Sequence, residues 1–322
     1  MTLRRVLHRS LGLFVFAYFA AAPALATGYV RGYLVDSVSL PTTPSEANAY
    51  AIDLNGDGNP DNNFGGFLAG MNGSFDMSSP MSAAVTNGSV VHLLSLHSTD
   101  PVFTSDPAAQ TDWYVGQAAP TPPLFDGTDD LLYDSNYAPG IFVAALSTGG
   151  FTSVDPVTTT APVSLTFVLQ FGPDTFPVPM HGARLSFTTD HSGHMQGQLN
   201  GSIKHDDYLL FIPQGTADMC NAAISADPNS NTSTTCKQIH DKGGSDCGSN
   251  SGSYMGDGLI EVCELTSNVF FQTLLLPDVQ IYQGGVYDPN PANTTPDSNS
   301  FGVRFTAIAS PDRVFANGFD PP

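Results

Sequence analysis

The chain has 322 residues, of which 41% are apolar, and carries 30 Asp and Glu against 10 Lys and Arg, a formal charge of −20. This apolar content supports a packed core and excludes a disordered chain. The acidic balance disfavours nucleic acids and anionic membrane surfaces as partners, because their phosphates repel it. Gly and Pro are abundant while helix-favouring cations are scarce, so strands and turns are favoured over helices.

The segment 1–26 has the three-part pattern of a secretory signal peptide. Basic MTLRRVLHRS is followed by apolar LGLFVFAYFAAA and then by the small residues Ala24 and Ala26. The apolar run is shorter than the roughly 20 residues that span a bilayer, and no later segment is long and apolar enough to do so. We therefore expect cleavage after Ala26 and export to the periplasm, the cell surface or the medium. Losing three arginines and no acid would change the formal charge from −20 to −23.

Short apolar stretches bounded by turn residues predict a series of strands. They occupy 90–98, 112–117, 141–147, 163–171, 183–189, 194–204 and 301–309. Strands at this spacing indicate a mainly β domain, sandwich- or barrel-like, over 27–204. The segment 118–140 reads as a long surface loop, and for 64–88 periodicity does not decide between a short helix and a glycine-rich loop.

The four cysteines all fall between residues 220 and 263, and we expect two local disulfides in an exported chain. Of the three connectivities, Cys220–Cys236 and Cys247–Cys263 are favoured because they close short loops. A four-thiolate zinc site is the alternative, but the sequence has no C-x-x-C pair.

Apolar residues at helical spacing around these cysteines predict a helical, EF-hand-like insertion over 205–280. Its last helix face is formed by Val262, Leu265, Val269, Phe270 and Leu274. The segment 281–310 then supplies a final strand that returns to the first sheet, and 311–322 is expected to be a flexible tail.

The stretch DLNGDGNPDNN predicts a calcium site. Asp53, Asn55, Asp57 and Asp61 fall at loop positions 1, 3, 5 and 9, with Gly58 at position 6 and Asn59 at position 7. Calcium takes six to eight hard oxygen ligands, and glycine permits the sharp bend. An Asx-rich turn without an ion is the alternative, but three carboxylates within nine residues repel one another unless neutralised. We expect Ca²⁺ to bind Asp53, Asn55, Asp57, Asn59 and Asp61 and to organise a surface loop.

A second stretch, GDGLIEVCEL at 256–265, matches positions 5, 6, 8 and 12 of an EF-hand loop. Counting back places Met255 at position 3, and methionine is no calcium ligand. An inserted segment would still allow a second ion to be held by Asp241, Asp246, Asp257 and Glu264. A degenerate loop that has lost its ion is the alternative.

No nucleophile elbow, H-E-x-x-H or phosphate-binding glycine loop occurs in the sequence. Four histidines cluster near acidic residues, and two of them form H-x-x-H, to which zinc would need a third ligand. They are His181, His191, His194 and His205, beside Asp190, Asp206 and Asp207. Exposed turn histidines are the alternative. Trp113 and Tyr114 are candidates for a sugar-stacking platform, with a core role for the tryptophan as the alternative.

The order of these motifs resembles a group of exported or lipoprotein-type proteins of myxobacteria and related Gram-negative bacteria. It runs from the D-x-N-x-D-G-x-x-D loop, similar to the calcium loops of FG-GAP/integrin-type repeats, through VVHLLSL, HGARLSF and GDGLIEVCEL to SNVFFQTLLLPDV and FGVRFTAI. The resemblance implies an exported protein with calcium-type loops and no assigned activity. This chain departs from the pattern in lacking a lipobox cysteine and in its disrupted second loop.

The favoured function is therefore a structural or surface-interaction protein of the envelope that binds calcium, and the motifs present favour a non-enzymatic role over an enzymatic one. A carbohydrate-binding or adhesin-type module with a glycan or envelope-protein partner is the first alternative. A secreted hydrolase that uses a carboxylate pair or the histidine cluster is the second.

Overall fold

The computed structural model describes residues 28–310, apart from 74, 154–161, 173, 191, 240–258 and 284–285. The expected signal peptide at 1–26 and the expected tail at 311–322 lie outside the described residues. Strands account for 39% of the structure and helices for 27%, which confirms a mainly β protein with a large antiparallel sheet.

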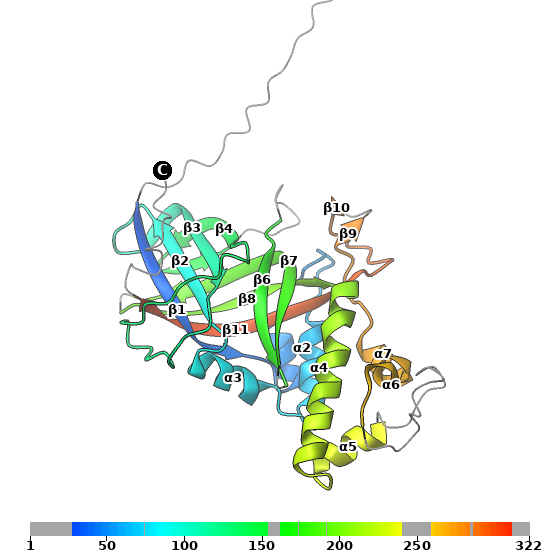
Figure 1. Ribbon diagram of the computed structural model, residues 1–322. Coiled ribbons are helices and arrows are strands. Elements are labelled where there is room, and N and C mark those ends of the chain that lie inside the picture. Colours follow the sequence, from blue (N-terminus) through cyan, green and yellow to red (C-terminus); the bar gives the residue numbers. More distant parts are fainter. Residues whose placement is uncertain are drawn as a thin grey trace, which may run out of the picture.

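Nine strands form the main sheet (Figure 1). They are β1 (Tyr29–Ser39), β2 (His92–Ser98), β3 (Ser105–Val115), β4 (Gly140–Ser147), β5 (Gly150–Thr152), β6 (Leu165–Phe171), β7 (Asp174–Thr189), β8 (His194–Lys204) and β11 (Ser298–Ser310). Their order is β5-β4-β3-β2-β1-β11-β8-β7-β6, and β5 also pairs with β7. Because Phe151 of β5 lies opposite Phe187 of β7, the ring of pairings closes, which favours the barrel-like alternative.

Alternation along the strands places apolar side chains inside this ring. In β4 the burial pattern changes at every residue, with Phe142 buried and Val143 45% exposed, as expected for a half-buried strand. Trp113 of β3 packs edge-on against Phe305 of β11, with ring centroids 5.2 Å apart. These contacts join strands that are distant in sequence into one core.

Strand β7 extends further than the predicted segment 183–189. Its first half pairs with β6 and contains Pro177 and Pro179, opposite Val168 and Thr166. Proline has no N–H to donate and is typical of sheet edges, and β6 is the last strand in the order. Because of these prolines, the sequence pattern did not predict the β6–β7 hairpin.

Three short helices fall between β1 and β2: α1 (Pro44–Ala49), α2 (Asn63–Met71) and α3 (Ser78–Asn87). Helix α2 packs on β11, and α3 packs on β1 and β6. The undecided region at 64–88 is therefore largely helical. Its helices bury Phe64, Phe67 and Leu68 against the core despite their glycines.

Four more helices lie between β8 and β11 in the chain: α4 (His205–Ala226), α5 (Asn231–Ile239), α6 (Val262–Ser267) and α7 (Val269–Leu274). The prediction of one helix face running from Val262 to Leu274 is wrong. The chain breaks at Asn268, whose side chain accepts from the Phe271 N–H and begins α7. As a result Val269 is 76% exposed rather than part of one buried face.

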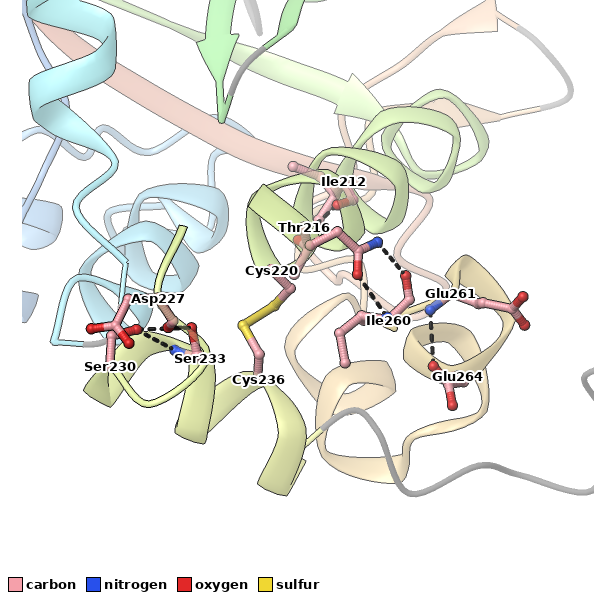
Figure 2. Close-up of a disulfide and its surroundings, with 11 residues drawn as sticks. Ile212, Thr216, Cys220, Asp227, Ser230, Ser233, Cys236, Ile260, Glu261 and Glu264 are labelled. Atoms are coloured by element: carbon pink, nitrogen blue, oxygen red, sulfur yellow. Dashed lines mark hydrogen bonds between the residues drawn. A yellow bond between two sulfur atoms is a disulfide. The ribbon is translucent and has the colours of Figure 1, made fainter. Parts of the chain in front are cut away.

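The predicted disulfide between Cys220 and Cys236 is confirmed, and it links α4 to α5 with both residues fully buried (Figure 2). Next to it, the Asn221 side chain donates to the Ile260 carbonyl and accepts from the Ile260 N–H, both at 2.8 Å. Cys263 is also disulfide-bonded, and its predicted partner Cys247 lies outside the described residues.

The final strand returns to the sheet as predicted, because β11 pairs with both β1 and β8. Two further short strands, β9 (Tyr282–Gln283) and β10 (Val286–Tyr287), form a separate ladder before it. Across the part of the chain that the structure describes, no helix combines the length and the apolar character needed to cross a membrane.

Candidate functional site

The loop predicted to bind calcium is closed at its base by a short β-bridge between Ile52 and Asp61. The Asp61 N–H donates to the Ile52 carbonyl at 2.8 Å. The Asp61 side chain in turn accepts the Leu54 N–H through Oδ2, also at 2.8 Å. Asp61, at loop position 9, is therefore hydrogen-bonded to Leu54 at position 2, and these bonds fix the two ends of the loop to each other.

The carboxylate of Asp53 organises the interior of this loop. Its Oδ1 accepts the N–H groups of Gly56 and Asp57 at 2.6 and 3.1 Å, and its Oδ2 accepts the Gly58 N–H at 2.8 Å. Gly56 and Gly58 have φ angles of 86° and 89°, which glycine adopts without strain. The alternating Asp-x-Asn-Gly-Asp-Gly pattern thus folds the backbone around one carboxylate.

Asn55 points into the same loop and is fully buried. Its Oδ1 accepts the Asp57 N–H at 3.0 Å, but its Nδ2 has no hydrogen-bond partner among the described residues. A buried polar group without a partner is costly.

Asp57 is held by its neighbour Asn59. Its Oδ1 accepts from both the backbone and the side chain of Asn59, at 2.7 and 3.0 Å.

The electrostatics of the loop are those of unneutralised carboxylates. Burial raises the pKa of Asp61 to about 7, against the lowering effect of the Leu54 N–H, and the charges of Asp278, Asp57 and Asp53 raise it further. Burial also raises the pKa of Asp278, although Ser300 donates to it. Ionised carboxylates at this point would be stabilised by a cation.

Asparagines just beyond the loop attach it to β11. Asn62 begins α2 by accepting the Gly65 N–H at 3.0 Å, and it also accepts the Gly302 N–H of β11 at 2.9 Å. The Asn63 N–H donates to Ser300 Oγ at 2.7 Å. Leu54 packs with Val279 and Ile281 in a small apolar cluster. The loop is therefore tied to residues more than two hundred positions later in the chain.

The predicted ligands do not form a ready-made metal cage. In the described ranges, no group of three or more His, Cys, Asp or Glu side chains is arranged to hold an ion. Two of the five predicted ligands are asparagines, and Asp53 is engaged by backbone amides. The loop supplies oxygen atoms on a fixed backbone. The Asn55 atom that lacks a partner among the described residues is Nδ2, a hydrogen-bond donor and not a cation ligand.

For the second candidate site, Asp241, Asp246 and Asp257 lie outside the described residues. Glu264 is described and is 2% exposed. Its carboxylate accepts the Glu261 N–H at 2.9 Å and forms a capping box at the start of α6. A capping role satisfies the helix terminus and is the function that the contacts give this residue.

The described histidines are not gathered in one place. His194 begins β8 and is exposed, whereas His205 follows the end of the same strand and contacts Asn299 at 3.0 Å. At about 3.3 Å per residue, this strand separates them by roughly 35 Å. His181 lies elsewhere, half-buried beside Ser164 and Tyr282. His191 lies outside the described residues.

Trp113 is not available as a sugar platform, because it is 1% exposed. Its ring packs against His92, Phe167 and Phe305. The core role that is usual for tryptophan therefore applies here. Tyr114, which points to the opposite face of β3, contacts Tyr133 and is only partly buried.

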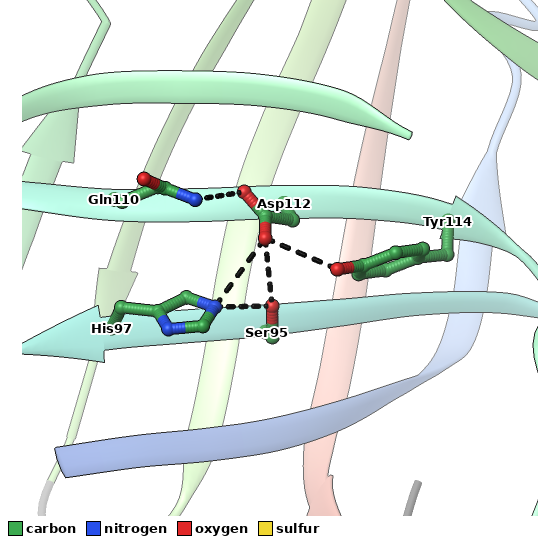
Figure 3. A network of polar contacts seen from close by, with 5 residues as sticks. All are labelled: Ser95, His97, Gln110, Asp112 and Tyr114. Atoms are coloured by element: carbon green, nitrogen blue, oxygen red, sulfur yellow. Dashed lines mark hydrogen bonds and ion pairs between the residues drawn. The ribbon is translucent and has the colours of Figure 1, made fainter. Parts of the chain in front are cut away.

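Tyr114 belongs to a polar network that sequence reasoning missed (Figure 3). The carboxylate of Asp112 accepts from Gln110, Tyr114 and Ser95, at 2.8, 3.1 and 3.4 Å. Both Ser95 Oγ and Asp112 Oδ2 contact the same ring nitrogen of His97, at 2.9 and 3.3 Å. The sequence pattern that could have revealed it is the placement of polar residues two positions apart in two predicted strands, Ser95 and His97 in one and Asp112 and Tyr114 in the other.

This network does not have the geometry of a serine–histidine–aspartate relay. In such a relay the serine and the carboxylate contact different nitrogens of the imidazole. Here Nε2 serves both, and Ser95 is 1% exposed. The network satisfies buried polar groups on the outer face of β2 and β3, which is a structural role.

Comparisons with protein-family models, with curated proteins and with solved structures found no match to this chain.

Proposed function

We propose that the loop 53–61 binds Ca²⁺ and that the chain is an exported, calcium-stabilised protein with a structural or surface-interaction role. The observation that carries this proposal is the Asp53 carboxylate, which accepts three loop N–H groups around two glycines of positive φ. This hydrogen-bonding arrangement fixes a sharply bent, oxygen-rich backbone. Such a backbone suits the flexible geometry of calcium better than the strict octahedron of magnesium.

The residues present fit a hard cation in one further respect. Asp61 is half-buried close to other acids. The ion would be held by oxygens of Asp53, Asn55, Asp57 and Asp61 and by the Asn59 carbonyl. Since the carboxylates are not already arranged as a cage, binding includes a local rearrangement of their side chains.

The ion's role in this proposal is to stabilise the attachment of the loop to β11. Asn62, Asn63 and Leu54 connect the loop to β11 and to the segment before it. Neutralising the loop would therefore strengthen a long-range contact of the fold. Binding to the folded state alone stabilises it in proportion to the logarithm of free calcium over the dissociation constant.

Calorimetric titration of the protein with calcium tests this function. Asp57→Ala removes a proposed ligand from an exposed position. Asp126→Ala is the matched control, because Asp126 Oδ1 likewise accepts the N–H two residues later and is also unburied. We expect the wild type and Asp126→Ala to bind alike and Asp57→Ala to bind at least tenfold more weakly. Identical heats for the wild type and Asp57→Ala would contradict the proposal.

A further inference from the structure

The outer face of three neighbouring strands carries rungs of polar side chains. Strand β8 places Gln196, Gln198 and Asn200 on this face, about 13 Å from first to last at 3.3 Å per residue. Gln196 lies between Thr188 of β7 and Thr306 of β11, and Gln198 lies between Ser186 and Arg304. Each such row of three side chains, one from each strand, is a rung, and the two rungs lie next to each other on the sheet. This outer face of β7, β8 and β11 is called the rung face below.

The rung face carries two open depressions. A cavity of about 660 Å³ is lined by both rungs and by Tyr50 and Thr152, and a second of about 220 Å³ adjoins it at Ser186 and Thr152. Tyr50, the residue that follows α1, lines the first cavity. Gln198 and Asn200 both donate to the Tyr50 carbonyl, at 2.7 and 2.6 Å. The Arg304 guanidinium lies 4.6 Å from the centre of the Tyr50 ring.

The charge of this groove is opposite to that of the chain. Among the described residues, no Asp or Glu lines either cavity, whereas the sequence carries 30 acids. Of the five Lys and Arg among the described residues, Arg304 lines the first cavity and Arg184 the second. Acids begin at the far end, where Asp36 and Asp190 line a neighbouring cavity and accept from Thr306 and Ser192.

Several lining groups are free to meet a ligand. The side chains of Gln196 and Thr188 are exposed and make no hydrogen bond with another described residue. Amides and hydroxyls both donate and accept, as sugar hydroxyls do. An arginine fork matches a carboxylate in shape and charge.

We propose that the rung face binds an oligosaccharide containing a uronic acid, with its carboxylate at Arg304 and its hydroxyls along Gln196, Thr188 and Thr306. The inference is separate from calcium binding at the loop 53–61, because none of the five ligands predicted there lines these cavities. It moves the glycan site from the buried Trp113 to the opposite part of the ring, where the described lining of the two cavities carries arginines and no acid.

The test is a calorimetric titration with a hyaluronan hexasaccharide, which contains glucuronic acid, and with a neutral glucose hexamer. Arg304→Gln removes the cation of the first cavity. Arg31→Gln is its matched control, because Arg31 also stacks on an aromatic ring, 4.4 Å from the centre of Phe103, outside the groove. Gln196→Ala changes the groove without breaking a contact to a described residue, so it remains informative if Arg304→Gln lowers stability.

We expect the acidic hexasaccharide to bind the wild type and Arg31→Gln alike, and to bind Arg304→Gln and Gln196→Ala at least tenfold more weakly. The neutral hexamer should bind more weakly than the acidic one. Absence of heat with both sugars, unchanged binding in both groove variants, or tighter binding of a polyglutamate peptide would overturn the proposal.

Discussion

Asp61, at the base of the loop 53–61, interacts electrostatically with Asp278, although the two residues lie near opposite ends of the described chain. Burial raises the pKa of Asp61 to about 7, and the charge of Asp278 contributes to that rise. Asp278 is itself bonded to Ser300 of β11, whose hydroxyl oxygen also accepts the Asn63 N–H. Repulsion between carboxylates therefore acts at the point where the acidic loop is hydrogen-bonded to the last strand.

Replacing Asp61 by Asn should have opposite effects with and without calcium. In EDTA at pH 8 the variant loses a repelled carboxylate but keeps an acceptor for the Leu54 N–H. We expect its free energy of unfolding to rise by about 1 kcal/mol, allowing for partial exposure. In calcium it should lose most of the stabilisation seen in the wild type. Urea melts in both buffers measure this, and equal calcium responses in the two proteins would count against the site.

Two glycine substitutions separate backbone conformation from packing. A Cβ at Gly58 or at Gly66 meets no atom within 4 Å, but only Gly58 has a positive φ, of 89°. Gly58→Ala should cost about 1–2 kcal/mol of stability and weaken calcium binding. Gly66→Ala, in helix α2, should stabilise by roughly 0.5–1 kcal/mol. Thermal unfolding of both variants checks this, and a Gly58→Ala protein as stable as wild type would show that the loop adopts another conformation.

His92 should make the stability fall in mild acid. It is fully buried between Trp113 and Phe167 and donates through Nε2 to the Val168 carbonyl at 3.1 Å. Burial lowers its pKa from 6.5 to about 4. The unfolded chain therefore binds the extra proton first, and the stability present above pH 6.5 is lost as the pH falls towards 4.

His92→Phe should remove this dependence, since a ring of similar size remains in the same aromatic stack. Relative to the variant, the wild type should lose about 2 kcal/mol between pH 7.5 and pH 5. Urea melts at the two pH values provide the comparison. Parallel stability changes in the two proteins would show that His92 does not carry the effect.

The strand pattern could be predicted because alternation is a local property. The segments at 141–147 and 194–204 coincide closely with β4 and β8, since buried and exposed residues alternate throughout β4 and at the start of β8. Ring closure could not be predicted, because it depends on the three-residue strand β5 pairing with β7. The first half of β7 was missed because its two prolines are unusual in a strand.

The candidate sites show the same limit. The oxygen-bearing residues of the calcium loop and its glycines were visible as spacing, and so was the local disulfide Cys220–Cys236. Asp278 and Ser300 were not, because only the packing of the loop against β11 brings them close. The rungs around Gln196 likewise depend on the register of three strands, which no single segment specifies.

The most direct measurement of calcium binding is a crystal structure of the protein grown with calcium. The account predicts one ion with oxygens of Asp53, Asn55, Asp57 and Asp61 and the Asn59 carbonyl at about 2.3–2.6 Å, and with the Asp53-to-Gly58 hydrogen bond retained. Density for water alone, with these side chains directed apart at saturating calcium, would contradict it.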